Sequence, residues 1–213
     1  MMRRHRFAAL LLLPLLAARA SQAVVSDADV RIQTSGAVPG KFAGYVQSGG
    51  WNLKAEIQGM NCGIWSFEAD INTVHTTAMT KALRQAIGDV TLLDPPMKPD
   101  QLVAAGYDGQ IAIVQGPANA TTVIQNGLFS ATGYATLTLD AYVAVSDPSG
   151  QRGQQPVTAE VKKQDTIFMC PDVSPIMATA AQEAIGRIAE QAAIAARQML
   201  LNRTATPVPA AAS

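Results

Sequence analysis

The chain has 213 residues, of which 48% are hydrophobic, 15% charged and 5% aromatic, and its 16 basic and 16 acidic residues give a net charge of zero. This length and apolar content are enough for one domain with a hydrophobic core. No basic cluster occurs beyond the N-terminus, which argues against a protein that binds nucleic acid or anionic membrane surfaces.

Residues 1–23 have the three parts of an export signal: the basic MMRRHRF, the apolar AALLLLPLLA, and ARASQA with its small residues. Cleavage can follow Ala20 or Ala23, and we favour Ala23. The apolar run is too short for a membrane span, which takes about 20 residues. We therefore expect no transmembrane segment in the mature chain, which keeps 12 basic and 16 acidic residues after four arginines leave with the signal.

The first half of the mature chain reads as short strands and one main helix. Gly and Pro interrupt residues 24–40, so we expect an extended arm with a short strand near 30–33. Alternation around the turn SGG predicts a β-hairpin formed by 41–47 and 51–58. The other expected elements are an extended stretch at 60–67, a helix from Asp70 or Asn72 to Gly88, a strand at 90–93, a short helix at 100–105, a buried strand at 109–115 and an irregular segment at 116–127.

The second half reads as a long hairpin and a long helix. The strand at 133–147 alternates strictly between an apolar and a polar face, and 156–170 returns as its antiparallel partner. Ser174 as cap and Pro175 at the first position predict a helix to about residue 202, with an alanine-rich apolar stripe.

These elements predict an α+β fold. We expect a two-layer sandwich with two main helices on one face of a mixed, largely antiparallel sheet that contains the long β-hairpin. The predicted organisation is a signal peptide at 1–23, a single domain at 24–203 and a disordered tail at 204–213.

The two cysteines predict one disulfide, because exported proteins usually oxidise such a pair. Cys62 precedes the first main helix and Cys170 precedes the second, so the two lie at similar heights if their strands are neighbours. Two free thiols, or a catalytic thiol at Cys62, are the alternatives. A catalytic thiol needs a base, and the only histidine left after signal removal is His75, which we expect to be solvated or hydrogen-bonded on its helix.

No pattern in the mature chain predicts a metal site, a cofactor site or a serine nucleophile. One histidine and two cysteines supply too few ligands for a metal, and Ser130 lacks a G-x-S-x-G elbow. We therefore expect no cofactor and no catalytic residue. A hydrolase that uses Glu68, Asp70 or Asp140 is an alternative, because paired carboxylates can perform acid–base chemistry.

The polar face of the long hairpin is a candidate surface for a partner. Aromatic side chains on an exposed sheet can anchor another protein, although such residues also suit a solvated strand. The candidate residues are Tyr134, Thr136, Thr138 and Tyr142.

The stretch FEADINTVHTTAMTKALRQAIGDVTLLD at 67–94, followed by a buried strand after AAGYDG, a long hairpin and a C-terminal alanine-rich helix, resembles a group of small envelope proteins of Gram-negative bacteria. This group includes LptE, the YajG-like lipoproteins and the N-terminal domain of TolB. The resemblance covers roughly residues 50–202 and implies a non-catalytic assembly or accessory role at the outer membrane. The chain lacks the anchoring cysteine of the lipoprotein members.

Together these observations predict a soluble periplasmic accessory protein that is not an enzyme. We expect it to bind another envelope protein in assembly or transport, and to associate with the outer membrane, if at all, only peripherally. A carrier of a lipid or other small apolar ligand, held between helices and sheet, is the second hypothesis.

Overall fold

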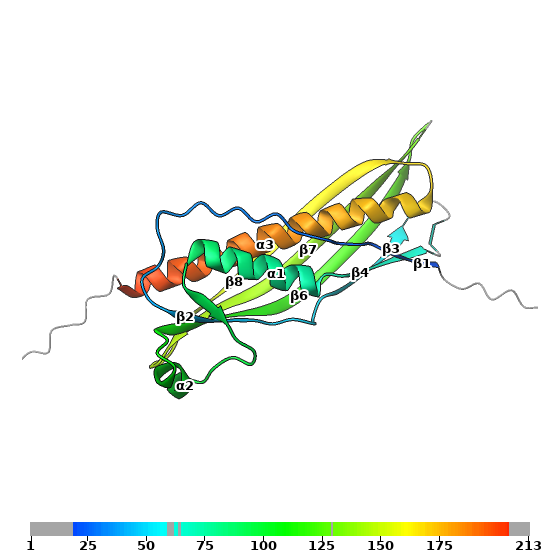
Figure 1. Ribbon diagram of the computed structural model, residues 1–213. Coiled ribbons are helices and arrows are strands. Elements are labelled where there is room, and N and C mark those ends of the chain that lie inside the picture. Colours follow the sequence, from blue (N-terminus) through cyan, green and yellow to red (C-terminus); the bar gives the residue numbers. More distant parts are fainter. Residues whose placement is uncertain (1–18, 59–61, 64, 129, 205–213) are drawn as a thin grey trace, which may run out of the picture.

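The computed structural model describes residues 19–58, 62–63, 65–128 and 130–204 (Figure 1). Its elements, in chain order, are β1 (Arg19–Gln22), β2 (Phe42–Val46), β3 (Asn52–Gln58), β4 (Trp65–Asp70), α1 (Asn72–Ala86), β5 (Val90–Leu92), α2 (Pro99–Ala104), β6 (Gly109–Asn126), β7 (Ala131–Asp147), β8 (Gly150–Ile167), a 3-10 turn η1 (Cys170–Asp172) and α3 (Val173–Thr204).

The strand β6 organises the sheet. One edge of β6 pairs with the whole of β7, which pairs in turn with β8. The other edge of β6 carries two strands end to end: β2 pairs with its first residues, and β3 pairs with Thr122 and Val123 near its end. Beyond these, β5 adds to β2, while β4 and then β1 add to β3. The eight strands therefore form one branched sheet.

The predicted α+β class, with two main helices on one face of a mixed sheet, is confirmed, but the sheet is not largely antiparallel as expected. Four of the seven strand pairings in the described chain are parallel, namely β1–β4, β2–β5, β2–β6 and β3–β6. Parallel pairs join strands that are distant in sequence, so local turn signals, which reveal only hairpins, could not predict them.

Two local predictions in the first half are wrong. The segments on either side of SGG do not form a hairpin: β2 and β3 never pair with each other, because each pairs in parallel with a different part of β6. The stretch 116–127 is not irregular, because β6 continues through it to Asn126. A register shift between Gln115 and Ala118 makes room for Gly116 and Pro117, and Pro is tolerated at such a bulge since it has no N–H to pair.

The helices agree with the predictions to within a few residues. The helix α1 begins at Asn72 with Ile71 at the N-cap position, so neither predicted cap residue is the N-cap, although the carboxylate of Asp70 accepts the N–H of Asn72 at 3.0 Å. It ends before Gly88, which has a φ of 103°, a value that glycine adopts without strain. The helix α3 begins at Val173, two residues before the predicted first position Pro175, so Ser174 lies inside its first turn and donates to the carbonyl of Gln22 at 3.4 Å.

The core lies between α3 and the three long strands. Small side chains line the buried face of α3, and the facing residues of β7 are buried to the same degree. Small residues let the helix approach the sheet closely and fill the interface without voids. The fully buried residues on the two surfaces include Ala180, Ala181, Ala184, Ile185, Ile188, Ala189, Ala192, Ala135, Leu137, Leu139 and Val143.

The arm at 24–40 is extended as predicted, but it contains no strand, so the expected strand near 30–33 is wrong. Its backbone pairs instead with side chains of the helices: Arg31 donates to Glu190 at 2.8 Å, and Ile32 donates to Gln85 at 3.0 Å. In Figure 1 the arm is the blue segment that runs along α3 and past α1. It therefore covers the helix layer from outside.

The predicted boundaries of the signal peptide and of the tail lie near the two ends of the described chain. The strand β1 is made of residues assigned above to the export signal, so cleavage after Ala23 would remove its pairing with β4. Residues 1–18 of the predicted signal and 205–213 of the predicted tail lie outside the described residues, and Thr204 is the last residue of α3.

Contact with the arm predicts that Gly186→Ala destabilises the protein, the opposite of the usual effect of Gly→Ala inside a helix. Gly→Ala inside a helix normally stabilises by about 1 kcal/mol, but a Cβ on Gly186 would lie 2.5 Å from the carbonyl oxygen of Asp29. We expect Gly186→Ala to lower the free energy of unfolding in urea by about 1–3 kcal/mol, because the arm must move. The control Gln191→Ala, at an exposed site on α3, should change stability by less than about 0.5 kcal/mol. A more stable Gly186→Ala protein would contradict the placement of the arm.

Candidate functional site: the open sheet face and the disulfide-bonded end

The helices cover one face of β6–β8 and leave the other face uncovered. The polar face predicted for 133–147 is this uncovered face, since the alternate residues of β7 are buried under α3. We call it the open face; its residues, from strand pairing, are Val114, Asn119, Thr121, Val123, Tyr134, Thr136, Thr138, Asp140, Tyr142, Pro156, Thr158, Glu160, Lys162 and Gln164. The four candidate partner residues are thus on one surface, and their role in binding stays a prediction.

An apolar row crosses the open face. Val114, Tyr142 and Pro156 are direct neighbours on β6, β7 and β8. Tyr142 is 40% exposed and Val114 38%, so both present carbon surface to solvent. The alternation of the sequence predicts Tyr142 at this face but not Val114 and Pro156, because only the pairing register brings the three together.

Polar pairs continue the open face beside this row. Thr158 donates to Asp140 at 2.5 Å, and Lys162 lies 2.9 Å from the carboxylate of Glu160. Both contacts are solvent-exposed, so they contribute little to folding stability. They do give the face a fixed pattern of hydroxyl, carboxylate and ammonium groups around an apolar centre, which is the usual anatomy of a protein-binding surface.

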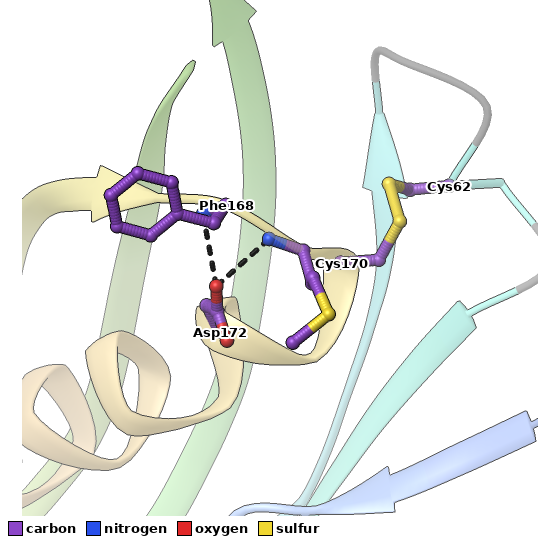
Figure 2. Close-up of a disulfide and its surroundings, with 5 residues drawn as sticks. Cys62, Phe168, Cys170 and Asp172 are labelled. Carbon is purple, nitrogen blue, oxygen red and sulfur yellow. Dashed lines mark hydrogen bonds between the residues drawn. A yellow bond between two sulfur atoms is a disulfide. The ribbon is translucent and has the colours of Figure 1, made fainter. Parts of the chain in front are cut away.

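The disulfide between Cys62 and Cys170 is present, with the two Cα atoms 5.8 Å apart (Figure 2). The pairing prediction is confirmed, which removes the catalytic thiol and the two free thiols as alternatives. The reason given for it is wrong: β4 and β8 are not neighbouring strands. The bond instead joins the segment before β4 to the turn between β8 and α3, and so ties distant parts of the sheet together.

His75 is expected from the sequence to be either solvated or hydrogen-bonded. The structure shows a hydrogen bond and no exposure to solvent. His75 is fully buried on α1, and its ring meets Trp51 edge-on with centroids 4.5 Å apart. Gln115 Nε2 lies 3.3 Å from His75 Nδ1, so a donating amide places the proton of the neutral ring on Nε2. That Nε2 atom has no partner among the described residues. Burial lowers the pKa of His75 from 6.5 to about 4.

The carboxylates considered for hydrolysis have structural contacts. Asp70 holds the start of α1, Asp140 accepts from Thr158, and Glu68 lies 3.9 Å from Lys54 on the adjacent strand. Glu68 and Asp70 are on β4, which is separated from the β7 strand of Asp140 by β3 and β6. This placement does not bring the carboxylates of β4 and β7 into one site.

Two hollows of the described surface lie outside the helix layer, and a third, of about 260 Å³, lies where the end of β8 meets the first turns of α3. A groove of about 530 Å³ runs along the outer side of α1, beside Thr76, Thr80 and Arg84, and one of about 550 Å³ lies between the arm and α3. Neither enters the space between α3 and the sheet, where the described residues are closely packed.

Two further features concern ligands and membranes. Within the described part of the chain, no group of three or more His, Cys, Asp or Glu side chains could hold a metal ion. No helix among the described residues is both long and apolar enough to cross a membrane.

Comparison with known proteins identifies the fold but no family. No protein-family model matches the chain, and no curated protein matches its sequence. Among solved structures, protein XCC0632 from Xanthomonas campestris, of family DUF330, aligns with a TM-score of 0.53 at 8% identity, over 88% of this chain and 99% of that one. The two proteins therefore share a fold.

Two other solved structures align more loosely. A minor lipoprotein from Acinetobacter baumannii gives a TM-score of 0.37 at 13% identity, over 76% of this chain and 94% of that one. The PelC dodecamer from Paraburkholderia phytofirmans gives 0.29 at 10% identity, over 81% and 98%. Both scores are too low to support an argument about function.

The disulfide predicts non-additive mutants. Cys62→Ser and Cys170→Ser should each lower the free energy of unfolding, by up to about 4–5 kcal/mol for a loop of 108 residues. The double variant should be no less stable than either single variant, because one bond is lost in all three. Urea denaturation measures this. Two free thiols in the unreduced, denatured wild-type protein would contradict the bond.

Burial of His75 predicts a specific loss of stability in acid. Its folded-state pKa lies below the unfolded value, so the unfolded chain binds more protons between pH 6.5 and about 4. The contribution of His75 is complete above pH 6.5 and falls by about 3 kcal/mol towards pH 4. The variant His75→Phe keeps the ring packing but has no group that titrates. We expect its free energy of unfolding, relative to that of the wild type, to rise as pH falls from 7 to 4.5. A stability difference that does not change with pH would contradict the buried neutral histidine.

Proposed function

We propose that the chain is a non-enzymatic accessory protein of the bacterial cell envelope that binds another envelope protein through the open face of β6–β8. The observation that carries this proposal is the apolar row Val114–Tyr142–Pro156 on a face that no helix covers. An exposed aromatic anchor with polar neighbours is typical of a surface that binds protein.

The size of the open face suits such a partner. A standard interface buries about 800 Å² on each protein and involves some 20–30 residues on a side. The strands β6, β7 and β8 contain 18, 17 and 18 residues, and every second residue faces outward. The fourteen open-face residues named above provide about half of that number, so a standard interface would also include residues around them.

The predicted export signal supports a function outside the cytoplasm. We propose the periplasm as the compartment, since the disulfide is of the kind that forms there and the mature chain has no expected membrane span. The role would be in assembly or transport, with at most a peripheral association with the outer membrane. The fold shared with the Xanthomonas protein is compatible with this proposal and adds no evidence on the role.

The packing of the core disfavours the ligand-carrier alternative. A lipid held between helices and sheet would have to displace residues such as Ala184 and Ile188 of α3 and Leu139 of β7, which are fully buried. The hydrolase alternative has less support, because its carboxylates lie on separated strands with structural partners.

Cross-linking followed by pull-down from the periplasm tests the proposal. Tyr142→Arg should reduce recovery of a discrete envelope protein at least tenfold, because it places a charge in the apolar row. The matched control is Thr77→Arg, at an exposed position on α1, which should recover the partner as the wild type does. Equal recovery by both variants would contradict binding by the open face. Hydrolytic turnover abolished by Asp140→Asn would contradict the non-enzymatic role.

A further inference from the structure

Three large apolar side chains are strongly exposed to solvent at one end of the molecule. Leu128 is 95% exposed, Phe168 81% and Met169 65%. We call these three residues the apolar tip. Exposed carbon of this extent is costly in water, and when it is grouped it usually marks an interaction site.

The three residues come from two loops that leave the sheet at the same place. Ala131 of β7 pairs both with Asn126 of β6 and with Ile167 of β8, and these are the last pairs of the two ladders. Leu128 lies in the turn after Asn126, and Phe168 and Met169 follow Ile167 directly. The apolar tip therefore extends the sheet beyond its last hydrogen-bonded row, at the end where the hairpin of β6 and β7 projects in Figure 1.

The backbone beneath the tip is fixed. The carboxylate of Asp172 accepts the N–H groups of Phe168 and Met169, at 2.9 and 2.8 Å (Figure 2). The disulfide at Cys170 holds the next residue. These bonds keep the backbone of Phe168 and Met169 in its projecting path, and a rigid display of this kind lowers the entropic cost of binding.

The export signal enters the fold at this same end. Arg19, the first residue of β1, is paired with Trp65, whose N–H donates to the carbonyl of Cys62. Cys62 is bonded to Cys170, the residue after Met169. The apolar run AALLLLPLLA ends two residues before Arg19. Before cleavage, the first residue of β1 therefore lies at the end of the molecule that carries the apolar tip.

We propose that the apolar tip docks on the surface of a lipid bilayer. Leu128 and Phe168 are so exposed that they protrude, and three protruding side chains offer far less than the broad surface that a stable protein interface requires. A bilayer can deform around such a tip, and large apolar side chains partition into the boundary between headgroups and acyl chains. This surface is distinct from the open face and does not depend on the protein-binding role proposed above.

The charged residues near the apolar tip indicate that the tip would bind a bilayer through apolar contacts and would not require anionic lipid. Asp165 and Asp172 are acidic, and Lys163 is paired with Glu183 of α3. No described basic group is therefore free on this part of β8 to attract anionic headgroups. With only three apolar residues the association is weak and reversible, which suits a peripheral protein.

Flotation of the exported chain with phosphatidylcholine vesicles tests the proposal. The wild type should float with the vesicles, and the variant Leu128→Ser/Phe168→Ser/Met169→Ser should bind at least tenfold less lipid. The control Val103→Ser/Val24→Ser removes two exposed apolar residues outside the tip and should bind as the wild type does. Circular dichroism and thermal unfolding confirm that each variant is folded.

A fluorescence readout gives an independent test of depth. Phe168→Trp should be quenched by brominated phosphatidylcholine, whereas Val103→Trp should not. Failure of the wild type to float would overturn the proposal, as would binding that occurs only with phosphatidylglycerol. A tip variant that floats normally but changes the oligomeric state would assign the tip to a second copy of the chain instead. Loss of the pull-down partner in Tyr142→Arg with normal flotation would leave the tip proposal intact.

Discussion

Close packing of α3 on one face of β6–β8 is the constraint on which the rest of the structure depends. Residues such as Ala180, Ala184 and Ile188 are fully buried in the interface, and small side chains let the helix lie near the sheet along its length. The arm and α1 then pack beside α3, and Arg197 donates to the carbonyls of Ser35 and Ala86 to join all three segments. Together, α3, α1 and the arm form one continuous layer over that face of the sheet.

Because the interior is closely packed, both binding roles proposed above use outer surfaces. The sheet face opposite α3 stays uncovered, and the ends of the long strands extend past the helix layer. The open face carries a wide pattern of polar groups around Tyr142, whereas the tip carries a few protruding apolar side chains such as Phe168. A broad mixed surface suits a protein, and a narrow apolar one suits a lipid surface.

Sequence patterns predicted the helices, the long hairpin, the disulfide and the polar face, because each leaves a local signal: helical spacing, alternation or paired cysteines. They failed where the structure depends on contacts between segments that are distant in sequence. The branching of β6, which takes β2 and β3 on one edge, has no local signal, and neither does the path that brings Cys62 to Cys170 from non-adjacent strands. His75 looks like any helical histidine until Trp51 covers it.

We propose that the space between helices and sheet is filled and that the protein therefore binds its partners through its surfaces. Native mass spectrometry of the protein purified from its own cell envelope tests this most directly. We expect the mass of the disulfide-bonded polypeptide alone. A lipid or other small molecule that co-purifies at one per chain, and that is lost only on unfolding, would contradict it.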